Sequence, residues 1–394
     1  MQFLTDPKID FMRYRAVLTV VSIALIVAGL LYVFVLGKLN IGIDFAGGTQ
    51  VRVQFQEQPD LDRLRSVLNE AGFPAALIQR LGEVDANEVL IRTATVEGSE
   101  EGSADALLEA MDTTFNPGLE TGTDINRQSA DAVARLLARL DPDGHGAPSP
   151  EAPEVAEPYQ QAADAILSLR REDGLIKAWE ELEGVAGVSP SILDSLKENA
   201  QIGDLAILAV ENVGPQIGSE LKRQGIWAVV LSLMGMLAYI WYRFELRFGV
   251  GAVAAIFHDV AITLAFYAFG GFEFNVTTIA AFLTLVGYSV NDTVVVFDRV
   301  RENMRRSRRE PLVNVLNTSI NQTLSRTIMT SGTTLLVVLT LFLYGGDVLE
   351  GFAFILLIGI VVGTYSSIYV ASPVVLLWER YFGREARIER AKAR

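Results

Sequence analysis

The chain has 394 residues and no cysteine, which excludes disulfides and thiolate metal sites. Residues 38–225 hold 33 Asp and Glu against 15 Lys and Arg, whereas the rest of the chain holds 14 against 18. An acidic block beside a mildly basic remainder argues against nucleic-acid binding, which needs a basic surface. With two histidines in the whole chain, we do not expect a multi-histidine metal centre.

Six predominantly apolar stretches are long enough to cross a lipid bilayer as helices. They are residues 16–37, 226–242, 248–270, 276–297, 327–344 and 352–378. The first is longer than the apolar part of a signal peptide and lacks a clear small-residue cleavage site, so we expect an uncleaved span. Residues 1–15 precede it, residues 379–394 follow the last span, and residues 298–326 are expected to form a loop.

The basic residues outside the acidic block indicate how the chain is oriented. All 18 lie in residues 1–15, 243–247, 299–326 and 379–394. Because positively charged loops stay on the cytoplasmic side, both termini and the 298–326 loop are expected in the cytoplasm. The acidic block at 38–225 is then expected on the opposite, extracytoplasmic side of the membrane.

Alternating apolar residues in the acidic block predict strands at 49–55, 76–81, 88–95 and 204–210. A helix is expected at 61–71, where leucines recur at helical spacing before a glycine. This order suits a split βαβ, ferredoxin-like α+β domain. It carries a helical insertion at about 97–203, with helices expected at 104–112, 124–140, 158–171, 174–182 and 189–199 and a Pro- and Gly-rich linker at 141–158.

Asp292 is the most unusual residue of the apolar segments. It lies about 24 Å into its helix at ~1.5 Å per residue, which places it in the cytoplasmic half of the bilayer. An acid at such depth costs about 2.5–3.5 kcal/mol and usually serves a pathway. Arg326 starts the next span at a matching depth, so the two side chains can pair. Two interpretations stay open, a carboxyl that loads and releases a proton or a static ion pair that fixes helix packing.

Other polar groups in the spans are candidates for supporting roles. His258 and Asp259 lie near the middle of the third span, where a neutral, hydrogen-bonded structural pair is favoured over a relay. Thr330, one turn beyond Arg326, either lines a hydrated path or bonds its own backbone, and the second is favoured. Small residues every fourth position on the last span predict close helix packing; they are Gly359, Gly363, Ser367 and Ala371. Because no P-loop, HExxH or nucleophile elbow occurs, neither catalytic residues nor an enzyme is expected.

Several long motifs resemble the SecF protein-export membrane subunits of the SecD/SecF family, in the RND superfamily. They are GIDFAGGT (42–49), VGPQIGSEL (213–221), HDV (258–260), VGYSVNDTVVVFDRVREN (286–303), TLSRTIMTSGTTL (323–335) and GTYSSIYVASP (363–373). The match departs from the usual family pattern between residues 96 and 203, where a much shorter connection is expected.

The resemblance implies half of a twelve-span unit completed by SecD, which associates with the SecYEG channel and draws exported preproteins outward with the proton-motive force. The family's intramembrane aspartate and arginine map onto Asp292 and Arg326 as a proton relay, which favours the first interpretation of this pair. Asn291 is then the expected hydrogen-bonding neighbour. The Gly47-Gly48 pair is expected to form a tight turn between the first span and the first strand.

Two other functions stay open on the sequence. One is a proton-driven exporter of small molecules or lipids, and the other is a non-conducting scaffold of the translocon. No bound cofactor is expected, and a lone carboxylate beside amides and hydroxyls serves H⁺ or Na⁺ equally well, although the resemblance favours H⁺.

Overall fold

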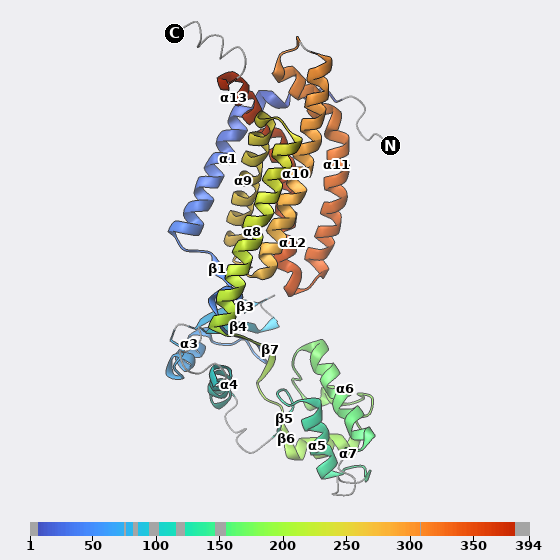
Figure 1. The fold of residues 1–394 in the computed structure, drawn as a ribbon. Helices are drawn as coiled ribbons and strands as arrows, with labels where there is room; N and C mark the ends of the chain where they lie inside the picture. The colour runs from blue at the N-terminus through green and yellow to red at the C-terminus, as the bar shows by residue number, and fades with distance from the viewer. Residues whose placement is uncertain are drawn as a thin grey trace. The chain divides into compact units, whose positions relative to one another are not determined.

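The computed structural model describes residues 7–74, 76–81, 86–93, 102–115, 123–145, 155–307 and 309–382 (Figure 1). The chain divides into two compact units. The sheet unit is Ala46–Ser219, and the membrane unit combines Met1–Phe45 with Glu220–Arg394. The expected domain at 38–225 is therefore too wide, because β1 (Asn40–Ile41) pairs in parallel with β8 (Glu273–Phe274) inside the membrane unit.

Six helical segments of the described residues are long and apolar enough to cross a membrane, as expected. The first consists of η1 (Phe11–Tyr14), α1 (Arg15–Leu30) and the π-helical η2 (Leu31–Val35), and the next four are α8 (Pro215–Arg243), α9 (Leu246–Phe269), α10 (Val276–Arg306) and α11 (Leu312–Tyr344). The last consists of α12 (Asp347–Ser366), the π-helical η6 (Ser367–Ala371) and α13 (Ser372–Phe382). Figure 1 shows the long helices running side by side.

Most of the expected loop at 298–326 is helical, so that prediction was wrong. α10 continues past the apolar run to Arg306 and α11 already begins at Leu312. Charged side chains one turn apart support the extension, since Glu302 pairs with Arg299 at 2.6 Å and with Arg306 at 2.7 Å. Both helices therefore extend well beyond their apolar spans at the charged end.

α9 and α10 form the centre of the membrane unit, and about half of each apolar window is buried. Gly359 and Gly363, two of the four small residues of the last span, pack closely against α10, in agreement with the predicted close helix packing. A methyl group at Gly359 would overlap the side chain of Leu285, and one at Gly363 would lie 3.2 Å from the Cβ of Ser289. This contact lets α12 approach α10 closely around the buried polar groups.

The sheet unit is a four-stranded antiparallel sheet with the strand order β3-β4-β2-β7. Its strands are β2 (Gly48–Phe55), β3 (Leu77–Leu81), β4 (Glu88–Thr93) and β7 (Leu205–Val213). α3 (Leu61–Glu70) connects β2 to β3, and α4 (Gly102–Phe115) follows β4. This topology confirms the ferredoxin-like split βαβ fold.

α4 corrects the expected start of the insertion. Leu107 and Met111 of this helix share a buried core with Leu64 and Leu68 of α3. It is therefore the second helix of the ferredoxin-like fold, and the insertion begins after it.

In the part that the structure describes, the inserted module contains two short paired strands and three α-helices. They are β5 (Thr123–Asp124), α5 (Ala130–Leu140), α6 (Glu157–Asp173), the 3-10 turn η5 (Trp179–Leu182), α7 (Pro190–Asn199) and β6 (Ala200–Gln201). These elements enclose an apolar core of their own. The helix expected at 174–182 shrinks to η5, while parts of the 88–95 strand and the 141–158 linker lie outside the described residues.

The predicted glycine turn has the backbone that requires glycine. Gly47 has φ +70° and Gly48 φ +137°, values that other residues adopt with strain. A Cβ at Gly47 would also lie 3.2 Å from the Cα of Pro215. The two glycines thus allow the chain to turn into β2 beside the start of α8.

Candidate functional site

Asp292 is buried in the membrane unit, with 4% of its surface exposed. Its Oδ1 accepts a hydrogen bond from the hydroxyl of Thr327 on α11 at 3.4 Å. Within the described ranges, its Oδ2 has no hydrogen-bond partner. Thr364 is a further side chain that interacts with this carboxylate. A buried carboxylate whose one direct hydrogen bond is long is poorly stabilised in its charged form.

Arg326 does not form the direct ion pair expected from the sequence. It is exposed, and the described part of the chain contains no contact within 4.0 Å between its guanidinium and Asp292. Thr327 faces the carboxylate, and consecutive residues of a helix point about 100° apart, so Arg326 points away. Any influence of Arg326 on Asp292 in this structure is therefore electrostatic and without direct contact.

Two further predicted residues lie away from Asp292. Asn291 is exposed and lines an open groove of about 510 Å³ between α8 and α10, so it is not the hydrogen-bonding neighbour that we expected. Thr330 is exposed, and its hydroxyl donates to the backbone carbonyls of Arg326 and Thr327 at 3.0 and 3.1 Å. Thr330 thus forms hydrogen bonds to the backbone of its own helix, the outcome favoured from the sequence. Thr327 supplies the hydroxyl that contacts Asp292.

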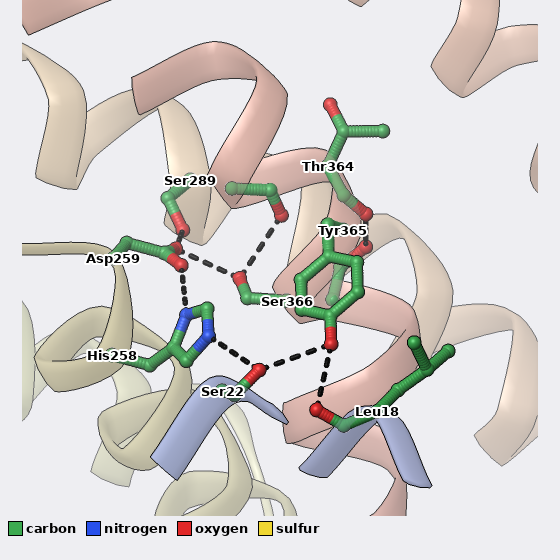
Figure 2. A network of polar contacts seen from close by, with 10 residues as sticks. Leu18, Ser22, His258, Asp259, Ser289, Thr364, Tyr365 and Ser366 are labelled. Carbon is green, nitrogen blue, oxygen red and sulfur yellow. Dashed lines mark hydrogen bonds and ion pairs between the residues drawn. The ribbon is translucent and has the colours of Figure 1, made fainter. Parts of the chain in front are cut away.

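His258 and Asp259 of α9 form the centre of a second polar network (Figure 2). They are 2% and 1% exposed, and His258 Nδ1 lies 2.8 Å from Asp259 Oδ1. Asp259 Oδ2 accepts hydrogen bonds from two hydroxyls, a very short one from Ser289 on α10 and one of 2.8 Å from Ser366 on α12. Both carboxylate oxygens of Asp259 therefore have partners.

On the other side of the imidazole, the network reaches the first span. His258 Nε2 lies 3.1 Å from Ser22 Oγ on α1, which lies 3.0 Å from the hydroxyl of Tyr365. The Tyr365 hydroxyl donates to the carbonyl of Leu18 at 3.0 Å, and its ring stacks on His258. Figure 2 shows these groups converging from α1, α9, α10 and α12.

The sequence analysis missed four members of this network: Ser22, Ser289, Tyr365 and Ser366. For Ser22 the sequence did contain a signal. Apart from Tyr32, Thr19 and Ser22 are the hydroxyl residues of the first span. The hydroxyls of the other helices stand among many serines and threonines. Only the fold tells which of them face the acid.

Comparisons with known proteins agree with this architecture. Residues 192–381 match the family described as protein export membrane protein SecD/SecF, C-terminal, and residues 34–59 match the SecD/SecF GG motif. Protein translocase subunit SecF of Koribacter versatilis is 39% identical over 398 residues, covering 97% of this chain and 95% of that protein. Its counterpart in Rhodothermus marinus is 45% identical over 254 residues, covering 57% of this chain and 82% of that protein.

The departure from the usual family pattern between residues 96 and 203 stays a prediction.

A solved structure extends the similarity to the fold. SecDF from Thermus thermophilus, a translocon-associated membrane protein, superposes with a TM-score of 0.66 at 33% identity. The match covers 96% of this chain but 40% of the SecDF chain, so the present chain spans about two fifths of that protein. On the end-to-end match to the Koribacter subunit, together with the six spans and the glycine motif, the chain belongs to the SecF family of multi-pass membrane proteins.

Proposed function

We propose that the chain acts with a SecD subunit as an accessory of the Sec translocon and couples the proton-motive force to preprotein movement across the bacterial inner membrane. Asp292 is the group that binds and releases the proton. The observation that carries this proposal is the buried carboxylate with one oxygen lacking a partner among the described residues.

The hydrogen bonding of Asp292 supports a group whose proton is exchangeable. A carboxylate that served only to fix helix packing would be expected to have its lone pairs satisfied, since unpaired buried polar groups are costly. Here Thr327 donates one long bond to Oδ1, and the positive charge of Arg326 acts from a distance. Protonation removes the unsatisfied charge, and deprotonation restores its attraction to Arg326.

Alternating access follows from this difference between the two states. When Asp292 is neutral, Arg326 loses its attraction to α10, so α10 and α11 are free to shift relative to each other. When the proton leaves, the attraction returns. One charge that crosses 100 mV releases about 2.3 kcal/mol, which is enough to shift such an equilibrium by more than tenfold.

The proposed partners and topology agree with the charge distribution. With both termini in the cytoplasm, the acidic sheet unit lies outside, where exported preproteins emerge from the SecYEG channel. The solved SecDF chain is more than twice as long as the matched part, which supports SecD as the missing half.

The test is the Asp292→Asn variant in inverted membrane vesicles with SecD and SecYEG. Preprotein transport is measured with and without an uncoupler of the proton gradient. We expect the variant to assemble with SecD and to lose the uncoupler-sensitive part of transport. Asp298→Asn on the same helix is the matched control, because Asp298 pairs with Arg243 at 2.7 Å in a partly exposed position where ion pairs contribute little.

Uncoupler-sensitive transport at the wild-type rate in Asp292→Asn would refute the proposal. Loss of transport in both variants alike would assign the effect to the helix rather than to the buried carboxyl. An unchanged rate in both, with intact SecD association, would favour the scaffold function.

A further inference from the structure

The hydrogen bonds around His258 and Asp259 need one more proton than the charged acid and neutral imidazole supply. Four contacts run in series from Asp259 to His258, Ser22, Tyr365 and the carbonyl of Leu18. Each contact requires one hydrogen. With Asp259 ionised and His258 neutral, the ring and the two hydroxyls provide three hydrogens for these four contacts.

One added proton completes the series in either of two positions. On His258, it gives an imidazolium that donates from Nδ1 to Asp259 and from Nε2 to Ser22. On Asp259, it gives a carboxylic acid that donates to Nδ1, while Nε2–H again donates to Ser22. In both cases Nε2 carries a hydrogen, Ser22 donates to Tyr365, and Tyr365 donates to Leu18.

Electrostatics also favours the state in which the His258–Asp259 pair holds the added proton. Without the added proton, the pair carries a net negative charge while nearly fully buried in the membrane unit. With it, the pair is neutral overall, which avoids the cost of a buried unbalanced charge. Titratable groups on the packed elements include Tyr365 on α12, which contacts the network, Tyr369 on η6, whose ring lies 5.2 Å from that of Tyr365, and Asp292 on α10, one turn from Ser289. α1 contributes no charged group beyond Arg15 at its first position.

We propose that His258 and Asp259 form a second proton-binding site, separate from Asp292, and that its proton holds α1 to the bundle through Ser22. When the proton leaves, the hydroxyl hydrogen of Ser22 turns toward Nε2, and the Ser22–Tyr365 contact loses its hydrogen. Ser22 is one of the two buried residues of α1, so this change weakens a contact at its buried face, while the hydrogen bond from Tyr365 to Leu18 remains. Only a role of this second site in transport depends on the proposed function, because proton binding to the site can be measured without SecD.

The chain offers a direct observable, since it contains only two histidines. In the His145→Gln variant, ¹⁵N-histidine labelling leaves His258 as the only labelled ring. The full-length protein in lipid nanodiscs is followed by NMR across the pH range in which it stays folded. We expect Nε2 to carry a hydrogen at the lower end and to lose it as the pH rises, leaving the Nδ1–H tautomer.

Asp259→Asn is the informative second variant. Its amide cannot ionise and can donate to Nδ1, so we expect a neutral ring with the hydrogen on Nε2 at every pH above ordinary histidine titration. Asp292→Asn should leave the wild-type switch in place, because the second site does not require that acid.

A ring whose Nε2 lacks a hydrogen at every pH overturns the proposal, as does an Asp259→Asn variant that switches like the wild type. Disappearance of the switch in Asp292→Asn also overturns it, since the site would then not be separate. Normal uncoupler-sensitive transport in Asp292→Asn would instead contradict the proposed function and leave the NMR result standing.

Discussion

The contact between α12 and α10 at Gly359 is a place where a single methyl group has a calculable effect. A Cβ at this position would lie 2.8 Å from Cδ2 and 2.9 Å from Cγ of Leu285. Carbon atoms prefer separations of about 3.5–4.0 Å. Leu285 is fully buried, so relief requires a new rotamer or a separation of the helices.

The expected cost of Gly359→Ala follows from these distances. Overpacking of this kind destabilises by about 1–3 kcal/mol. The change from glycine to alanine in a helix returns up to about 1 kcal/mol. Gly332→Ala on α11 isolates the second effect, because no atom lies within 4 Å of the added Cβ. The difference between the two variants therefore measures the packing effect alone.

The measurement is thermal unfolding of the purified chain in one detergent and at one scan rate. One kcal/mol shifts the Tm by about 2–4 °C in units of 150–250 residues, and the membrane unit that carries both substitutions falls in this size range. We expect the Tm of Gly359→Ala to be roughly 2–12 °C below that of Gly332→Ala, from an overpacking cost of about 1–3 kcal/mol. Equal Tm values for the two variants would refute the reasoning and show that α10 and α12 are not tightly packed here.

Two further predictions concern charge and pH. Arg326→Lys should retain most uncoupler-sensitive transport, and Arg326→Gln should lose it. The reason is that Arg326 is linked to Asp292 by its charge at a distance and not by a bidentate contact. Equal loss of transport in both variants would contradict this prediction. In the sheet unit, burial, with a smaller contribution from the hydrogen bond to Asp141, raises the pKa of Tyr159 above its usual value of 10.0. The neutral Tyr159 side chain then contributes its full stabilisation of the fold below about pH 10 and loses it as the pH rises through the pKa of the folded state. The difference in tyrosinate absorbance between wild type and Tyr159→Phe should therefore appear only above about pH 10.

Much of the fold follows from sequence periodicity, and the exceptions have identifiable causes. The strands and spans were predictable because apolar alternation and apolar length are local properties. The charged extension of α10 was missed because its helix is supported by ion pairs rather than by apolar residues. α4 was assigned to the insertion because its place between β4 and β7 depends on contacts with α3 that are distant in sequence.

The candidate site was predictable only in part. The depth of Asp292 in its helix identified the acid, and this requires no knowledge of neighbouring helices. To predict which way a side chain points, one must know how its helix is rotated about its own axis. The polar residues of α11 are spread around the helix, so their pattern does not reveal this rotation. For this reason Arg326 was expected beside the carboxylate, whereas the structure places Thr327 there.

The two buried acids differ in how their charge is stabilised, and this difference assigns them different tasks. Asp259 receives hydrogen bonds from Ser289 and Ser366 besides its contact with His258, whereas Asp292 receives a single long one. Ser289 and Asp292 are neighbours on one turn of α10, and at Gly363 α12 packs closely against Ser289. If the proposed protonation of Asp292 shifts α10, Ser289 moves with this helix, and the hydrogen bond that Ser289 gives to Asp259 changes. Under the proposal of a second proton site, such coupling is reciprocal, so a proton at His258 and Asp259 biases the position of α10. Each site then alters the proton affinity of the other without being required for it.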